Sequence, residues 1–334
     1  MLINFYLAGI TGIMNILVTG AAGFIGSHIA ELLASAEHNV TAADNLSDYY
    51  SKELKLSNVD ALKKKGIDFI ETDLRYANQY KNLPKDINYI FHFAAQPGLS
   101  ATASFDDYLS NNVRATYELV QFTKTCTKLR LFVNISTSSV YGLNAGKDET
   151  SVPEPASYYG VTKLAAEQLV LAESRNKKFN ACSLRLYSVY GPRERPDKLY
   201  TKLIHSALLD EPFTLIEGSL QHKRSFTYVG DIADGILKVI GKEDTVNNEI
   251  FNIGSDAQHT TEEGIKAVEK ITGKEISFTM LPPRPGDQLS TKAVIDKAKQ
   301  VLNYTPKTSL TEGIQQQVNW FKENLLLRAT TNSV

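Results

Sequence analysis

A glycine-rich turn between an apolar run and a helical pattern is the feature that most constrains the fold of this chain. The run spans residues 15–19, and the turn after it carries Gly20, Gly23 and Gly26 in the spacing G-x-x-G-x-x-G. Glycines allow a tight bend and let backbone amides approach a pyrophosphate at the start of the following helix. Gly-rich turns also occur for geometric reasons alone, but a position between a strand and a helix favours dinucleotide binding. The turn predicts a dinucleotide-binding unit.

Short β-branched runs continue to alternate with helical patterns through the first half of the chain. After a helix at 24–36, further buried strands are expected at residues 39–44, 68–71, 89–93, 131–135 and 181–186. This rhythm predicts a parallel sheet with helices on both faces. Beyond Gly191 turns and Pro-bearing loops prevail, and residues 252–254 are expected to return to the main sheet. The predicted class is α/β: a Rossmann-type doubly wound parallel sheet with a smaller, interleaved C-terminal α/β domain.

The interleaving sets the expected domain boundaries. Residues 14–187 and 229–254 form the predicted dinucleotide-binding domain, residues 188–228 and 255–328 the substrate domain, and residues 1–13 and 329–334 extensions. The net charge of −1 gives no field that would attract nucleic acid or a membrane surface. No segment is long and apolar enough to span a bilayer. We therefore expect a cytoplasmic protein without nucleic-acid or membrane partners, whose two cysteines, Cys126 and Cys182, are reduced.

An acid at the end of the second expected strand supports the cofactor prediction. Asp44 lies where a carboxylate accepts hydrogen bonds from the adenosine ribose, and its charge repels a 2′-phosphate, so NAD is favoured over NADP. Asp73 follows the third strand and either lies near the adenine or caps a helix; both interpretations stay open. His28 and His92 are expected to be packed or hydrogen-bonded, and no histidine pair has metal-ligand spacing, so no metal is predicted.

Tyr159 and Lys163 carry the chemistry that the sequence predicts most directly. Their spacing places both side chains on one face of a helix, where the ammonium can lower the pKa of the phenol from its usual value of about 10. A phenolate can then act as a general base on an alcohol. The pattern alone is common, but a hydroxyl-rich run at 136–139 ends a strand upstream and can bind the same substrate oxygen.

Together with the glycine turn and Asp44, these residues resemble the extended short-chain dehydrogenase/reductase family, from Met14 to about Lys322. The resemblance implies that Tyr159 is the base, Lys163 its partner and Thr137 the matching hydroxyl, because Thr137 stands just before Val140-Tyr141-Gly142. It implies that Asn112 supports the active-site strand. The residues expected to hold tightly bound NAD are Gly20, Gly23, Phe24, Ile25, Gly26, Asp44, Asn45, Asp73, Leu74, Ala94, Ala95, Tyr159 and Lys163.

Two helical segments, residues 108–124 and 158–172, resemble those that pair into a four-helix dimer interface in this family. The resemblance therefore implies a homodimer.

The residues after Thr137 indicate which reaction of the family to expect. Family members that dehydrate the sugar carry an Asp-Glu pair there, and those that decarboxylate it carry a Glu just before Val-Tyr-Gly. This chain has Ser138 and Ser139, which leaves oxidation and reduction at C4 of the sugar. Residues 44–50, 189–197 and 224–229 look like those of UDP-glucuronate 4-epimerases. The resemblance implies NAD-dependent oxidation at C4, rotation of the 4-keto sugar and return of the hydride to its other face.

A uronic acid needs its carboxylate held out of line with the 4-ketone, or carbon dioxide is lost. Ser138, Ser139 and Ser188 are candidates for this task, with strand-end capping as the alternative. The resemblance places Arg224 and Arg284 on the diphosphate and Asp287 on the uridine ribose, since guanidinium suits phosphate oxygens. Arg195 reaches the nucleotide or forms a surface ion pair with Glu194 or Asp197.

The chain also departs from the epimerase pattern. Those enzymes carry an Arg shortly after the His-x-Ala-Ala segment, and residues 96–102 have none. A 4-epimerase acting on UDP-glucose or UDP-N-acetylglucosamine therefore stays open, as does a UDP-glucuronate decarboxylase in which a water replaces the absent Glu. A non-catalytic dinucleotide sensor is disfavoured because Tyr159 and Lys163 are both present.

Overall fold

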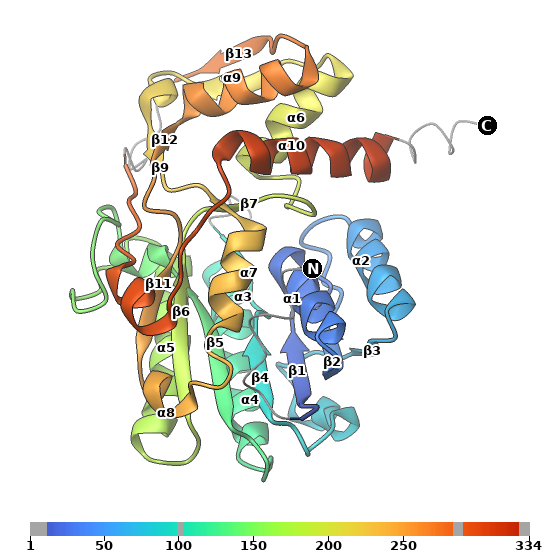
Figure 1. Ribbon diagram of the computed structural model, residues 1–334, viewed down its shortest axis with the longest axis vertical. Coiled ribbons are helices and arrows are strands. Elements are labelled where there is room, and N and C mark those ends of the chain that lie inside the picture. The colour runs from blue at the N-terminus through green and yellow to red at the C-terminus, as the bar shows by residue number, and fades with distance from the viewer. Residues whose placement is uncertain (1–11, 99–102, 283–289, 327–334) are drawn as a thin grey trace.

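The main body of the molecule is one parallel sheet covered by helices on both faces (Figure 1). The computed structural model describes residues 12–98, 103–282 and 290–326. Seven strands lie in the order β11-β6-β5-β4-β1-β2-β3, and every neighbouring pair is parallel. They are β1 (Asn15–Thr19), β2 (Asn39–Asp44), β3 (Asp68–Glu71), β4 (Tyr89–His92), β5 (Leu131–Thr137), β6 (Ala181–Leu186) and β11 (Ile250–Ile253). The predicted fold class and the return of the chain to the main sheet at β11 are confirmed.

Helices on the two faces bury the sheet, whose strands are apolar on both sides as parallel sheets require. One face carries α1 (Phe24–Ser35) and α7 (Val229–Leu237), with α2 (Lys52–Lys64) packed against α1. The other carries α4 (Ala115–Thr123) and α5 (Tyr158–Arg175). Short segments complete this body: η2 (Ala77–Asn82), α3 (Phe105–Tyr108), η3 (Leu109–Arg114), η4 (Ser138–Tyr141), α8 (Glu243–Val246) and η6 (Ala298–Leu302).

The helix expected at 108–124 is present, but it is not α-helical throughout. It begins as α3 at Phe105, widens into a π-helical turn at η3 and continues as α4. A π-helical turn contains one residue more than an α-helical turn. This insertion rotates the apolar face by only part of a turn, so the periodicity of the sequence does not reveal it. Asn112 lies in this wide turn, on the buried side of the helix, and contacts Thr162 of α5.

A second group of elements lies beyond the carboxyl ends of the sheet strands, at the top of Figure 1. It contains α6 (Leu199–Leu209), α9 (Thr261–Thr272), α10 (Leu310–Phe321) and η7 (Lys322–Leu326), with η5 (Ser219–Gln221). Three two-stranded ladders join it: β7 (Val189–Tyr190) with β10 (Thr227–Tyr228), β8 (Phe213–Ile216) with β13 (Phe278–Leu281), and β9 (Lys223–Arg224) with β12 (His259–Thr260). Its own apolar core includes Tyr200, Ile204, Ile265, Ile314 and Val318. We propose that the two cores mark the two domains at the boundaries expected from the sequence.

Helix caps fix where the helices that carry functional residues begin. The Ser157 hydroxyl accepts a hydrogen bond from the Gly160 amide at 3.1 Å and so starts α5 immediately before Tyr159. In α9 and α10, capping boxes built on Thr260 with Glu263 and on Ser309 with Glu312 define the first turns. Within the described residues, no helix has the length and apolar character needed to cross a bilayer.

Candidate active site

The three residues predicted to be catalytic meet at the carboxyl end of β5. Thr137 is the last residue of that strand, and Tyr159 and Lys163 lie one turn apart at the start of α5. The Tyr159 hydroxyl is hydrogen-bonded to the Thr137 side chain and to the backbone of Gly98. All three line one cavity of about 590 Å³. The arrangement presents a hydroxyl pair to any ligand oxygen that enters between β5 and α5.

Electrostatics at this pair differ from the expectation that Lys163 lowers the pKa of Tyr159. Burial raises the pKa of Tyr159, and the hydrogen bond with Thr137 and the charge of Arg195 lower it in part. Burial also lowers the pKa of Lys163, to about 8, because its ammonium is removed from water. The protein alone therefore favours a neutral phenol, and a positive charge brought next to Tyr159 would favour the phenolate.

The glycine turn has the close packing that a pyrophosphate cradle requires. Gly20 has a φ of +69°, and a Cβ there would lie 2.6 Å from the Ala94 amide nitrogen. A Cβ at Gly26 would lie 2.3 Å from the Gly20 carbonyl oxygen. Both positions therefore exclude any larger residue, and the turn presents backbone at the start of α1, as dinucleotide binding needs.

A small cavity of about 70 Å³ adjoins the glycine turn where the adenosine half of NAD would lie. It is lined by the predicted residues Asp44, Asn45, Asp73, Leu74, Ala94 and Ala95, together with residues such as Gln96 and Asn111. The Asp44 carboxylate accepts hydrogen bonds from the amides of Ala22 (3.1 Å) and Leu46 (2.8 Å). It thus locks the glycine turn to the end of β2. Asp73 accepts hydrogen bonds from the backbone amide and the guanidinium of Arg75. The next helical segment, η2, has Tyr76 and not Asp73 at its N-cap.

The cavity of about 590 Å³ is lined by residues from both the predicted cofactor set and the predicted substrate set. Its lining includes Gly20, Gly23, Phe24, Ile25, Gly26, Ala94 and Ala95 from the cofactor set, and Ser138, Ser139, Ser188, Arg195 and Arg224 from the substrate set. Arg284 and Asp287 lie outside the described residues. Segments far apart in the sequence therefore converge on one cavity between the sheet and the second group of elements.

Arg195 forms the ion pair with Asp197 that the sequence offered as one of two interpretations, but it does so inside the cavity. Its guanidinium binds Asp197 through two hydrogen bonds of 2.9 Å, yet the residue is buried and lines the cavity. It also lies 5.5 Å from the centroid of the Tyr49 ring. The ion pair is therefore part of the cavity wall, not a surface contact.

Lys55 is one of the cavity-lining residues that were not predicted to belong to the site. Lys55 on α2 is only 4% exposed, and its ammonium donates to the Ser47 hydroxyl at 2.8 Å beneath the Tyr50 ring. The sequence signal was present, because Lys55 shares the buried stripe of α2 with Val59 and Leu62. A lysine in an apolar stripe is rarely buried unless it has a partner or a function.

Buried hydrogen bonds hold the site from behind. Asn112 donates to the Thr162 hydroxyl at 3.0 Å and accepts from the Gln96 amide at 2.7 Å, so it ties α5 to the segment after β4. His92 bridges the Thr19 and Thr116 hydroxyls at 2.8 and 2.9 Å, and burial lowers its pKa to about 3. His92 is thus a neutral structural residue, and Asn112 supports the catalytic helix.

Comparison with known proteins identifies the group to which this site belongs. The profile of the NAD dependent epimerase/dehydratase family matches residues 16–254. A relative described as an uncharacterised UDP-glucose epimerase of Bacillus subtilis strain 168 is 37% identical over 310 residues, which cover 91% of this chain and 97% of the relative. This chain belongs to the NAD-dependent epimerase/dehydratase family.

Solved structures align with this epimerase over most of its length. UDP-glucuronic acid 4-epimerase from Bacillus cereus, in complex with UDP-glucuronic acid and NAD, is 35% identical with a TM-score of 0.85. The match covers 93% of this chain and 99% of that one. UDP-glucose 4-epimerase from Thermotoga maritima, with UDP-glucose, is 29% identical with a TM-score of 0.83, over 93% and 100% of the two chains. This epimerase is an enzyme whose cofactor is NAD.

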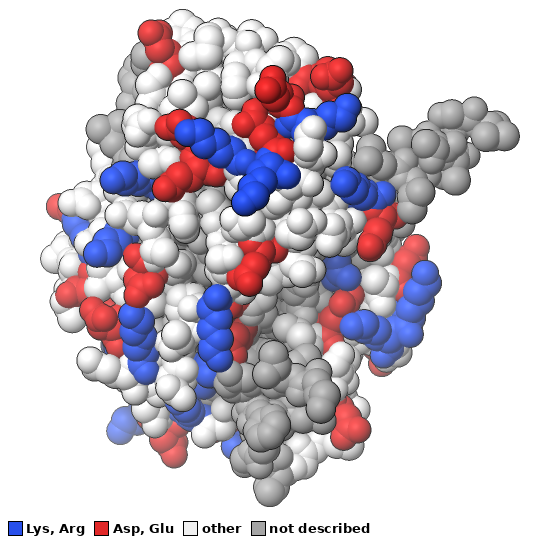
Figure 2. All heavy atoms as spheres, turned by 45° about the horizontal axis from the view of Figure 1, so that its top comes forward, with Lys and Arg blue, Asp and Glu red and all other residues white. Residues whose placement is uncertain are grey.

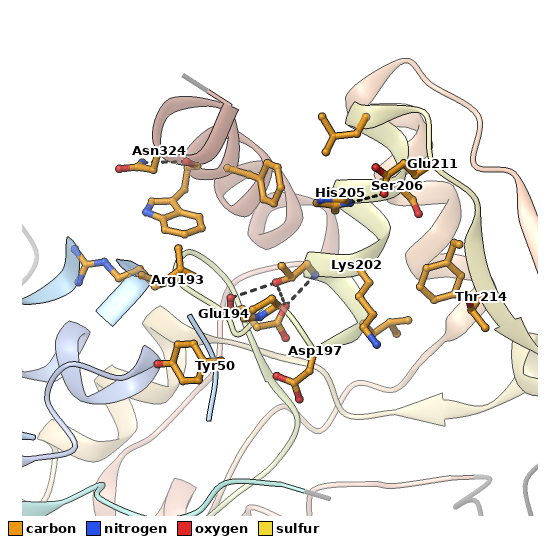
Figure 3. Close-up of a pocket in the computed structure, with 18 of the residues that line it drawn as sticks. Tyr50, Arg193, Glu194, Asp197, Lys202, His205, Ser206, Glu211, Thr214 and Asn324 are labelled. Carbon is orange, nitrogen blue, oxygen red and sulfur yellow. Dashed lines mark hydrogen bonds and ion pairs between the residues drawn. The ribbon is translucent and has the colours of Figure 1, made fainter. Parts of the chain in front are cut away.

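Apart from the two cavities of the candidate site, a separate cavity of about 920 Å³, hereafter the second cavity, lies beside it (Figure 3). Glu194 separates the second cavity from the catalytic cavity of about 590 Å³ and lines both, and its carboxylate accepts hydrogen bonds from the Thr201 hydroxyl and the Gln317 amide. Lys202 and His205 of α6 face this second cavity, not the catalytic one. On the face shown in Figure 2, acidic and basic side chains are interspersed.

Proposed function

We propose that this epimerase converts UDP-glucuronate to UDP-galacturonate by oxidation and reduction at C4. The observation that carries the proposal is the wall after Thr137, where Ser138 and Ser139 line the cavity. Among the described residues that line it, Glu194 has the one carboxylate, and that group is bound to Thr201 and Gln317. The cavity therefore offers hydroxyls, but no acid placed for elimination at C5 or C6 of the sugar.

The catalytic residues have the positions that reversible oxidation of an alcohol requires. Tyr159 accepts the proton of the C4 hydroxyl and returns it after the sugar has turned, while Thr137 holds the same oxygen. Lys163 lies one turn further along α5, where it can orient the nicotinamide ribose. When bound, NAD supplies the hydride acceptor and then the hydride donor for C4. Because each turnover regenerates it, we expect NAD to remain bound through purification.

An enzyme that acts on UDP-glucuronate must prevent loss of the sugar carboxylate, a requirement that neutral sugars do not have. Ser138 and Ser139 follow the catalytic Thr137 directly, and Ser188 lines the cavity from the end of β6. We propose that these hydroxyls hold the carboxylate out of line with the 4-ketone, which prevents loss of carbon dioxide. Arg224 lines the same cavity and is the proposed diphosphate ligand.

Product analysis with three substrates in parallel tests the proposal. The purified enzyme, without added NAD, is incubated with UDP-glucuronate, UDP-glucose and UDP-N-acetylglucosamine. We expect UDP-galacturonate from the first substrate, without carbon dioxide. Conversion of a neutral sugar alone would transfer the activity to the second candidate, a UDP-hexose 4-epimerase, which the absence of an arginine from residues 96–102 favours. Formation of UDP-xylose would identify a decarboxylase.

A further inference from the structure

Lys198 is a cation of the catalytic cavity that the proposed chemistry has not used. It precedes α6 as the N-cap residue, and its side chain lines the cavity. A Cβ built on Gly98 would lie 3.4 Å from the Lys198 ammonium and 3.0 Å from the Arg195 guanidinium. The two cations therefore stand together against Gly98, whose backbone is hydrogen-bonded to Tyr159. This places the ammonium at the end of the cavity where the sugar reacts.

The carboxylates near Lys198 are bound to other groups, so its ammonium can bind an anion. Asp197 is engaged with Arg195 through both carboxylate oxygens. Glu194 points away, to Thr201 and Gln317. Among the described residues, the Lys198 ammonium makes neither a hydrogen bond nor an ion pair. Asp197 and Glu194 attract the Lys198 ammonium electrostatically, but both carboxylates are hydrogen-bonded to other groups, so the ammonium can still bind an anion that enters the cavity.

A lysine at the N-cap of α6 does not stabilise the helix. N-cap residues that stabilise helices have a side-chain acceptor, and α6 has no side-chain cap. An ammonium at this end also opposes the helix dipole. A residue that is unfavourable for the helix and turned into the active site points to a role in binding.

We propose that Lys198 binds the carboxylate of the uronic acid and thereby selects acidic over neutral UDP-sugars. The inference rests on the proposed function, whose cavity and substrate it shares. It also accounts for the departure noted in the sequence: the segment after His92 has lost an arginine, and Lys198 places a cation against Gly98 of that same segment. The diphosphate is the other anion of the substrate, but it is common to all UDP-sugars and gives no selectivity.

The test compares binding of UDP-glucuronate and UDP-glucose by titration calorimetry. The full-length, NAD-loaded enzyme is used with Tyr159→Phe as the background, so that turnover does not disturb the heats. We expect Lys198→Asn to lower the ratio of the two affinities, glucuronate over glucose, by roughly 10- to 100-fold, the range for a lost hydrogen bond to a charged group. Lys198→Arg keeps the charge and should retain most of the ratio.

Asparagine is chosen because it can cap α6, so a thermal midpoint equal to or above that of the parent shows that folding is intact. Lys202→Asn is the matched control, one turn along the same helix but facing the second cavity. An equal loss of affinity for both sugars, which leaves the ratio unchanged, would assign Lys198 to the diphosphate and overturn the proposal. The proposal would also be overturned if Lys198→Asn left the affinity ratio unchanged, or if Lys202→Asn lowered that ratio as much as Lys198→Asn does.

Different measurements test the proposed function and the role of Lys198, so either can be refuted without the other. Absence of turnover of UDP-glucuronate by the wild-type enzyme would refute the proposed function. The affinity ratio, measured without turnover, decides the role of Lys198 in either case.

Discussion

The carboxylate of Glu167 on α5 lies 2.6 Å from the guanidinium of Arg185 on β6, and solvent reaches neither side chain. A second hydrogen bond of 3.0 Å makes the contact bidentate, and Arg185 also donates to the Tyr141 hydroxyl at 2.8 Å. Glu167 follows Lys163 by one helical turn. The pair therefore fixes the catalytic helix against the sheet at the depth where Lys163 meets the cavity.

Loss of one member of this pair should be costly, because the other charge stays buried without a partner. We expect Arg185→Met to lower the free energy of unfolding by about 3–5 kcal/mol. The double variant Glu167→Met/Arg185→Met removes both charges and should recover much of that loss. Urea unfolding followed by circular dichroism measures both. A loss below about 1 kcal/mol in the single variant would show that the pair does not hold α5.

Two glycines with positive φ provide a matched test of the cofactor turn. Gly20 (+69°) and Gly66 (+74°) have similar backbone strain, but a Cβ meets the Ala94 backbone at Gly20 and nothing within 4 Å at Gly66. Gly66→Ala should therefore cost about 1–3 kcal/mol of stability and keep NAD. Gly20→Ala should in addition lose bound NAD, measured by chromatography of the released nucleotide. Equal NAD content in both variants would contradict the assigned cradle.

If Tyr159 is the general base, its substitution should reduce turnover without affecting cofactor binding. Tyr159→Phe removes the hydroxyl that contacts Thr137 and leaves Lys163 and the glycine turn in place. We expect kcat to fall by roughly 10²–10⁴-fold, the range for a general base, with NAD content unchanged. Tyr158→Phe is the control, because Tyr158 is the neighbouring, exposed tyrosine. Turnover near the wild-type level in Tyr159→Phe would transfer the role of base to another group.

Local patterns in the sequence predicted most of the framework, because each strand and its following turn leave a short-range signal. Strand β1, the glycine turn and the acid at the end of β2 are examples: a buried run, a close-packed bend and a charge at a set distance. The shared location of Tyr159 and Lys163 on α5 was predictable for the same reason, since two residues one turn apart share a helix face.

Long-range contacts were not predictable in this way. Within the π-helical turn at η3, Asn112 donates a hydrogen bond to Thr162 of α5, a contact that periodicity does not encode. The pKa of Tyr159 depends mainly on burial, and the charge that lowers it in part is that of Arg195, which lies far from Tyr159 in the sequence, and not that of Lys163. The position of Lys198 beside Gly98 joins segments a hundred residues apart, and no pattern within either segment indicates that they meet.

The expected homodimer makes a prediction about an exposed apolar face. Leu109, Tyr117 and Val161, from η3, α4 and α5, are each more than 40% exposed. Apolar groups gathered on the two helices of an expected interface indicate a partner surface. We expect Val161→Glu to change the sedimentation mass from two chains to one. Leu143→Glu, which introduces the same charge at an exposed leucine outside these helices, should leave the mass unchanged. A wild-type mass of one chain would refute the dimer.

Glu194 makes the stability of the wall between the two cavities depend on pH. Burial raises the pKa of its carboxyl from 4.5 to about 7, and the hydrogen bonds from Gln317 and Thr201 only partly offset this. Between pH 4.5 and 7 the folded protein therefore keeps a proton that the unfolded chain releases. By linkage, this group makes the free energy of unfolding fall as pH rises through that window, with the full cost present above pH 7.

Glu194→Gln removes this titration and keeps the shape of the side chain, so the difference between variant and wild type isolates the contribution of Glu194. We expect the two proteins to respond alike to urea near pH 4.5. The variant should become more stable by on the order of 2–3 kcal/mol as pH rises to 7.5, since each unit of pKa shift corresponds to about 1.4 kcal/mol. A stability difference that is constant with pH would mean that Glu194 is already ionised at pH 5. In that case its hydrogen bonds with Thr201 and Gln317 would outweigh the cost of burying the charge.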